Sequence, residues 1–123
     1  MLVNRLDHVN ITVPRPLEAA AKQFYGSVLQ LQEVPKPEGS RGRGGAWYQL
    51  GPTQIHLSLE DRDADHTARR HICLIVSELE EMKRHLENAG VEIIPDDLPT
   101  PGWPRFYIRD PGGNRIEVAQ PEE

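Results

Sequence analysis

The sequence predicts one α+β domain made of two βαβββ modules. Two observations support this: strand and helix patterns follow the same order twice, and residues of one type recur at similar offsets in the two halves. The first module spans residues 1–62 and the second residues 68–123, with the charged linker EDRDADHTAR at residues 60–69. One helix cannot cover both faces of a four-stranded sheet, so we expect each module to need its copy to complete a core.

The composition is that of a turn-rich globular protein. The chain has 123 residues, of which 37% are hydrophobic and 27% charged, with 10 glycines and 11 prolines, so a single compact domain is expected. A formal net charge of -5 disfavours nucleic acid as a partner. No segment has the apolar length of a membrane span or the pattern of a signal peptide, which predicts a cytoplasmic protein without membrane association.

Cys73 is the only cysteine of the chain, and it lies in the apolar run HICLIV. An intramolecular disulfide is therefore excluded, and a reducing compartment is indicated. We expect a buried structural thiol rather than a nucleophile.

The first module begins with a strand at residues 5–13, RLDHVNITV. The segment 15–31 has the apolar spacing of an amphipathic helix, and a strand at 31–35 follows. The strands AWYQL and TQIHLSL come next, separated by a Gly51-Pro52 turn. The segment 36–45, KPEGSRGRGG, does not join a strand to a helix, so we expect a flexible loop rather than a phosphate cradle. Its Arg41 and Arg43 are candidates to reach an anionic substrate.

The second module repeats this order. RHICLIV is a predicted strand, and the segment 77–90 is a predicted helix with a Ser77–Glu80 capping box and Gly90 at its end. Three strands should follow, VEII at 91–94, RFYIRD at 105–110 and NRIEVA at 114–119. The loop at 95–104 carries Trp103, for which a lid over the cavity is a hypothesis.

Four of these strands carry one histidine or glutamate on the face opposite their apolar residues, because side chains alternate along a strand. Imidazole and carboxylate suit Zn, Ni, Co, Mn or Fe, and side-chain types alone do not choose among these metals. If a pseudo-twofold axis relates the modules, the four side chains can surround one point. We therefore predict a single divalent metal site formed by His8, His56, His71 and Glu117.

The offsets between the halves support this set. His8 lies 63 residues before His71, and His56 lies 61 before Glu117. Tyr48 and Pro52 each lie 59 before Tyr107 and Pro111. Alternation points Asp7 away from His8, so we expect Asp7 to be an exposed surface residue rather than a partner of that ring.

Several stretches of the chain together match a known family: LDHVNITVP, FYGSVLQL, IHL, RHICLIV and FYIRDPGGNRIEV, of which the closing DPGGNRIEV is the most specific part. They resemble the vicinal oxygen chelate superfamily, which includes glyoxalase I, methylmalonyl-CoA epimerase, extradiol dioxygenases and the fosfomycin and bleomycin resistance proteins. The resemblance implies a glyoxalase-like fold, in which paired βαβββ modules form curled mixed sheets around a metal cavity, and a homodimer. The family's ligand positions match His8, His56, His71 and Glu117.

The resemblance also implies the chemistry. The metal binds two neighbouring oxygens of a small-molecule substrate and acts as a Lewis acid, while Glu117 and His56 are the candidate catalytic residues for proton transfer. The expected reaction is that of a lyase or isomerase on a small oxygenated metabolite. Candidate substrate-binding residues are Trp47, Trp103, Tyr107 and Arg115.

Glutathione-dependent glyoxalase I is not the expected activity. The short bacterial enzymes of that type have arginine and asparagine at the positions that are Thr12 and Glu60 here. Glu60 would repel the carboxylates of glutathione.

Two alternatives remain open. One is a metal-free binding protein of the bleomycin-resistance type, with an aromatic cleft formed by Trp47, Trp103 and Tyr107. The other is an Fe(II) extradiol-type dioxygenase in which His8, His71 and Glu117 form a two-histidine, one-carboxylate triad. His56 would then act from outside the coordination sphere or as an acid/base group.

Overall fold

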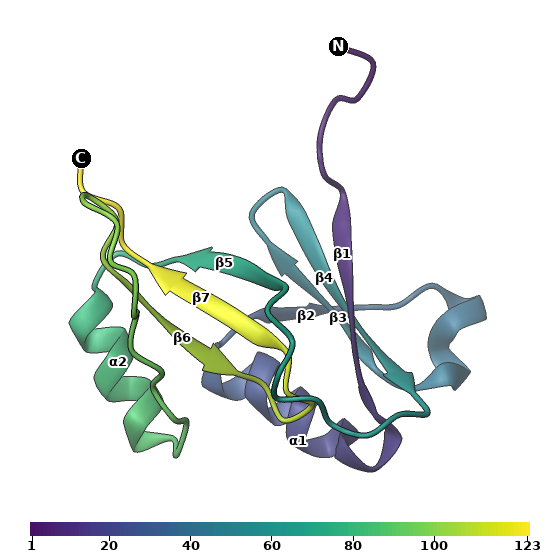
Figure 1. Ribbon diagram of the computed structural model, residues 1–123. Helices are drawn as coiled ribbons and strands as arrows, with labels where there is room; N and C mark the ends of the chain where they lie inside the picture. The colour runs from purple at the N-terminus through teal and green to yellow at the C-terminus, as the bar shows by residue number, and fades with distance from the viewer. The chain divides into compact units, whose positions relative to one another are not determined.

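In the computed structural model, which describes residues 1–123, the chain divides into two compact units, Met1–Ala64 and Asp65–Glu123 (Figure 1). Each unit contains one mixed sheet and helical segments, so the predicted α+β class is confirmed. The boundary falls within the charged stretch 60–69. None of the helices has the length and apolar character that crossing a bilayer requires.

The first unit has a four-stranded sheet in the order β1-β4-β3-β2. β1 pairs with β4 in parallel, and the other neighbours are antiparallel. Its strands are β1 (His8–Pro14), β2 (Gln32–Val34), β3 (Ala46–Leu50) and β4 (Thr53–Glu60).

The predicted helix at 15–31 is present as three consecutive segments: η1 (Arg15–Leu17), α1 (Glu18–Gln23) and the π-helical η2 (Phe24–Val28). Gln30, with φ 59°, follows the last segment in the left-handed conformation. A Cβ at Gly26 of η2 would lie 3.6 Å from the Tyr48 ring, which places this helix against β3.

The flexible loop predicted at 36–45 is wrong in part, because it contains the 3-10 helix η3 (Glu38–Arg43). Pro37 precedes η3, and its carbonyl accepts the Ser40 N–H at 2.9 Å. Pro37 is the N-cap of η3, with φ -56° and ψ 148°, and it lacks an N–H that would need a partner there. The segment therefore has a defined backbone.

The strand register confirms the predicted division of faces in the first unit. Ile55 pairs with both Val9 and Tyr48, so the apolar residues of three strands share one face. His56 pairs with both Asn10 and Trp47, so the polar residues share the other. Buried residues of the apolar face and helix include Ile11, Val13, Ala21, Phe24, Tyr25, Ala46, Tyr48, Ile55 and Leu57.

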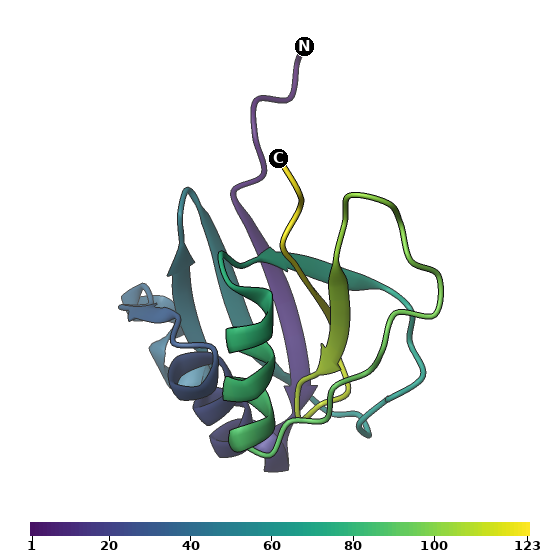
Figure 2. The same cartoon turned by 90° about the vertical axis from the view of Figure 1, so that its left-hand side faces the viewer.

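The second unit has a three-stranded sheet in the order β5-β7-β6, with β5 and β7 parallel and β6 antiparallel to β7. Its elements are β5 (His71–Ile75), α2 (Leu79–Asn88), β6 (Arg105–Arg109) and β7 (Arg115–Ala119). In Figure 2, the long connection after α2 loops out and returns along β6. Buried residues of this unit include Leu86, Phe106, Ile108, Ile116 and Val118.

The predicted strand at 91–94 is wrong. Only an isolated bridge forms, in which Ile94 and Tyr107 exchange backbone hydrogen bonds of 2.8 and 2.9 Å. Pro95 follows at once and has no N–H to extend a ladder.

The predicted capping box of α2 is also wrong. The N-cap residue is Glu78, and no side chain of the cap hydrogen-bonds the helix. Instead, the Leu79 N–H donates to Gln120 Oε1 at 2.8 Å, from a segment that follows β7. The expected end of the helix is confirmed, because Gly90 adopts φ 81°, which favours glycine.

The two sheets repeat one register. His8 pairs with Gln54 and Asn10 with His56 on β1 and β4; His71 pairs with Arg115 and Cys73 with Glu117 on β5 and β7. The equivalence of His8 with His71, and of His56 with Glu117, therefore holds in each sheet.

The proposed equivalence of Tyr48 with Tyr107 is wrong. Trp47 pairs with His56, and Tyr107 pairs with Glu117, so Trp47 is the counterpart of Tyr107. Tyr48 lies one residue further along, on the apolar face, because neighbours in a strand point to opposite sides.

Candidate metal centre

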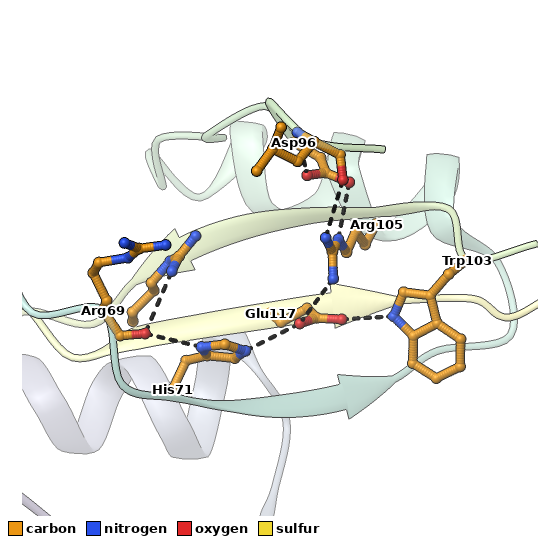
Figure 3. A network of polar contacts seen from close by, with 8 residues as sticks. Arg69, His71, Asp96, Trp103, Arg105 and Glu117 are labelled. Carbon is orange, nitrogen blue, oxygen red and sulfur yellow. Dashed lines mark hydrogen bonds and ion pairs between the residues drawn. The ribbon is translucent and has the colours of Figure 1, made fainter. Parts of the chain in front are cut away.

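Glu117 is the centre of a polar network on the sheet of the second unit (Figure 3). The residue lies in the middle of β7 and is 5% exposed. Oε2 accepts the indole N–H of Trp103 at 2.6 Å. Oε1 lies 3.1 Å from His71 Nε2 and 3.6 Å from Arg105 Nη1. One carboxylate oxygen is thus held by tryptophan, while the other faces an imidazole and a guanidinium.

The network keeps Glu117 ionised. Burial raises the pKa of this carboxyl, but hydrogen bonds from Trp103 and Cys73, the charge of Arg105 and the His71 contact outweigh burial and lower the pKa below its usual value. A buried carboxylate that stays charged is suited to bind a cation.

His71 faces Glu117 through Nε2. Its Nδ1–H donates to the Arg69 carbonyl at 3.0 Å, so Nε2 is the ring nitrogen left for Glu117 or for an ion. Nε2 and Glu117 Oε1 lie 3.1 Å apart, and a proton or a metal ion between them makes that contact favourable. Two ligand atoms about 2.1 Å from one ion lie roughly 3.0–3.4 Å apart, so this pair fits a divalent ion.

In the first unit, His8 and His56 stack on each other. Their ring centroids are 4.1 Å apart, with planes at 15°. The other face of His56 lies against Trp47, with centroids 3.7 Å apart and planes at 4°. Burial lowers the pKa of His56, and the neighbouring His8 acts in the same direction. His56 is therefore a neutral imidazole between two rings.

Asp7 contacts His8, which corrects the expectation that it points away. His8 Nδ1–H donates to Asp7 Oδ2 at 2.9 Å. The two are adjacent in the chain, and Asp7 lies outside β1, where strand alternation no longer applies. The contact leaves His8 Nε2 as the acceptor nitrogen, in the way carboxylates orient metal-binding histidines.

A chain of amides determines the tautomer of His56. Gln49 Nε2 donates to the Gly51 carbonyl at 2.7 Å, so its Oε1 accepts Gln54 Nε2 at 2.8 Å. Gln54 Oε1 then accepts the Nε2–H of His56 at 2.8 Å. His56 consequently offers Nδ1, not Nε2, as its lone-pair nitrogen.

Each unit therefore brings together two of the four predicted ligands. His8 lies with His56 and His71 with Glu117, and no group of three or more metal-ligating residues forms a cluster. That the two pairs bind one ion remains a prediction.

The predicted substrate-binding residues have different surroundings. Trp47 lines a cavity in the first unit and Trp103 a separate groove in the second, while Tyr107 lines neither. Tyr107 is 6% exposed and lies beneath Arg115, whose guanidinium carbon is 3.8 Å from the ring centroid. Trp47 belongs to the first unit and Trp103 and Tyr107 to the second, so a cleft formed by all three residues remains a prediction.

Cys73 is exposed rather than buried as predicted. Partial burial and a hydrogen bond with Glu117 raise the pKa of its thiol to about 11. The thiol thus stays protonated, and it is a hydrogen-bond donor to Glu117 rather than a nucleophile.

Sequence reasoning missed Arg105, Asp96 and Gln54. Arg105 Nε donates to Asp96 Oδ2 at 2.9 Å, and this pair orients the guanidinium toward Glu117. Alternation along β6 was a usable signal for Arg105, because it shares a face with Tyr107. Nothing in the sequence indicated that the loop residue Asp96 would pair with it.

Comparisons with known proteins agree with this fold. The sequence model of the Glyoxalase/Bleomycin resistance protein/Dioxygenase superfamily matches residues 5–118. A glyoxalase family protein from Bacillus anthracis is 35% identical, covers 99% of this chain and 98% of its own, and superposes with a TM-score of 0.89.

Two further relatives are more distant. A virulence protein from Salmonella typhimurium is 25% identical over 131 residues, which cover 98% of this chain and 86% of that protein. The fosfomycin resistance protein FosX from Listeria monocytogenes has a TM-score of 0.82 with 98% and 93% coverage, and at 16% identity it shows the fold alone.

Proposed function

Because the chain belongs to the glyoxalase/bleomycin resistance protein/dioxygenase superfamily, we propose that it is a metal-dependent enzyme acting on a small oxygenated metabolite. His8, His56, His71 and Glu117 would together hold one divalent ion. The observation that carries the proposal is the 3.1 Å separation between His71 Nε2 and Oε1 of the buried Glu117. A divalent cation between these two atoms would be bound by both.

The residues suit a proton-transfer reaction of the lyase or isomerase type. The bound metal would supply Lewis acidity to two neighbouring substrate oxygens. Trp103 holds Glu117 Oε2, which leaves Oε1 for the ion or for a substrate proton. His56 remains neutral because burial lowers its pKa. Its Nδ1 lone pair is therefore available to the ion, or to a substrate proton when it is not bound to the ion.

One observation favours a second candidate. Gln54 Oε1 accepts the Nε2–H of His56, so one of the two ring nitrogens of His56 is already engaged. With His56 outside the coordination sphere, His8, His71 and Glu117 form a two-histidine, one-carboxylate set. Such a set is typical of Fe(II) dioxygenases. His56 would then transfer protons without binding the metal.

Metal content of the untagged protein tests the proposal. The wild type should bind about one equivalent of a divalent metal per chain, measured by elemental analysis after dialysis against trace-metal-free buffer. Glu117→Ala and His71→Ala should lose it, and the control His66→Ala, which removes an exposed imidazole of the linker, should retain it. A wild type that binds no more metal than Glu117→Ala would overturn the proposal.

His56→Ala separates the two candidates. Loss of metal together with activity places His56 among the ligands. Retention of metal in His56→Ala, together with a wild-type activity that requires iron and oxygen, supports the dioxygenase.

The proposal includes a cytoplasmic homodimer, as the family resemblance implies. Light scattering coupled to size-exclusion chromatography should give twice the chain mass of 13.9 kDa. A monomer at micromolar concentration would contradict this part.

A further inference from the structure

The first unit contains a cavity of about 440 Å³ beside His56. β4 and the segment that includes η3 form its walls, and Trp47 and His56 line it together. The cavity thus lies against the polar face of the sheet, next to a pair of candidate metal ligands.

The charges that line this cavity are all positive. Arg15, Lys36 and Arg43 line it and no carboxylate does, although the whole chain carries a formal net charge of -5. A local excess of cations in an acidic protein attracts anions to one place.

Two of the three cations already have partners. Arg15 Nε lies 2.8 Å from Asp61 Oδ1, and the Lys36 ammonium donates to the Gly44 carbonyl. Arg43 makes no hydrogen bond or ion pair and is exposed at the end of η3. Its guanidinium is therefore free to bind a ligand.

The backbone after Arg43 has a defined conformation. Gly44 and Gly45 adopt φ 74° and 75°, and the Gly45 N–H donates to Glu18 Oε2 at 2.8 Å. That hydrogen bond engages the carboxylate of Glu18, which does not line the cavity. The turn thus presents Arg43 at a fixed place along the wall.

We propose that this cavity binds the anionic group of the substrate, a carboxylate or a phosphate, through Arg43 with support from Lys36 and the Ser40 hydroxyl. Planar guanidinium groups match the geometry of both oxyanions. This assignment rests on the proposed function, since it makes the cavity the part of the active site that selects acidic metabolites. Of the two arginines in the loop, Arg43 lines the cavity and Arg41 does not.

The test is an NMR titration of the metal-free, full-length protein with inorganic phosphate at constant ionic strength. Backbone amides of Arg43, Gly44 and Trp47 should shift and saturate. Arg43→Gln should weaken the affinity for phosphate about tenfold, the usual loss for a charge-assisted hydrogen bond. The control Lys22→Gln removes an exposed charge of α1 that does not line the cavity, and it should bind phosphate as the wild type does.

The same titration with sodium acetate shows which kind of anion the cavity prefers, and acetamide shows whether the charge is required. Acetate binding as tightly as phosphate indicates a carboxylate substrate, and weaker binding indicates a phosphate. Acetamide, which has the shape of acetate without its charge, should not displace either anion.

Three results would overturn the anion site: no saturating shifts at the cavity, unchanged affinity in Arg43→Gln, or acetamide competing as well as acetate. Phosphate binding that appears only after a metal is added would also overturn it, since the metal would then hold the anion. Because the titration uses metal-free protein, failure of the metal site leaves its outcome unaffected.

Discussion

His71 Nε2 and Glu117 Oε1 lie 3.1 Å apart, while the remaining Glu117 oxygen accepts a 2.6 Å hydrogen bond from Trp103. The indole therefore determines which carboxylate oxygen faces the histidine. Positioning of this kind acts on metal affinity without direct contact between tryptophan and the ion.

Trp103→Phe should weaken metal affinity by about 10- to 100-fold, because it removes the donor that orients Glu117. Competition with a chromogenic chelator measures this affinity. The loss of the donor should also raise the pKa of Glu117, so that metal uptake requires a higher pH than in the wild type. Leu98→Ala, an exposed side chain of the same loop, is the control. Equal affinities in the wild type and Trp103→Phe would exclude the positioning role.

Alternation along the strands predicted the division of faces correctly, because β1, β3 and β4 align their apolar residues in register. It failed where tertiary contacts replace local signals. Pro95 ends pairing after Ile94, and Gln120 supplies the cap that Ser77 was expected to supply. A cap from a distant segment leaves no trace in the helix's own sequence.

The candidate metal site could also be predicted from the sequence only in part. Residue type and offset identified the four residues His8, His56, His71 and Glu117, but not which of them contact each other. The structure brings His8 against His56 and His71 against Glu117. The partners that set the ring tautomers, Asp7 and Gln54, were not found. Their roles depend on rotamers and on an amide chain that runs across two strands.

Tyr48→Phe should stabilise the protein by about 1 kcal/mol. The Tyr48 hydroxyl is buried without a hydrogen-bond partner, which costs free energy that phenylalanine does not incur. Urea denaturation at neutral pH measures the difference. A variant less stable than the wild type would show that the hydroxyl makes a favourable interaction.

The same substitution should change alkaline stability. Burial raises the pKa of Tyr48 to about 12, whereas an unfolded tyrosine ionises near 10. Above that lower value the unfolded state loses its proton first, so the free energy of unfolding of the wild type falls as the pH rises toward 12. Tyr48→Phe should lose less stability between pH 9 and 11 than the wild type. Parallel pH profiles would contradict this.

Asp96→Asn should reduce the loss of stability that the protein shows as the pH falls. The hydrogen bond from Arg105 holds the pKa of Asp96 below its usual value. A carboxyl with a depressed pKa contributes stability above its unfolded pKa, about 4, and this contribution is lost as the pH falls through the folded value. The variant should therefore be less stable than the wild type at pH 7, with a gap that narrows toward pH 3. Asp97→Asn, which removes an exposed neighbouring carboxylate, is the control for charge.

Turnover of the hemithioacetal of glutathione and methylglyoxal should be close to background. Thr12 hydrogen-bonds Glu60 Oε1 at 2.9 Å, and Arg62 lies 3.0 Å from the same oxygen. These residues bind one another where short bacterial glyoxalase I enzymes have residues for glutathione, so neither Thr12 nor Glu60 offers a site for its carboxylates. A standard spectrophotometric assay of the metal-loaded protein measures the rate. Turnover well above that of Glu117→Ala would refute the prediction.

Gly45→Ala should destabilise the protein by about 3 kcal/mol or more. Gly45 has φ 75°, and a Cβ there would lie 2.0 Å from the Leu57 carbonyl oxygen, so the backbone of β4 would have to move. Gly51→Ala is the matched control, because its φ of 57° is also positive and no atom lies within 4 Å of the added Cβ. The control should cost only about 1 kcal/mol, the penalty of the left-handed conformation itself. Chemical denaturation of both variants separates conformational strain from the steric clash, and equal losses would show that the close approach to Leu57 is not what requires glycine.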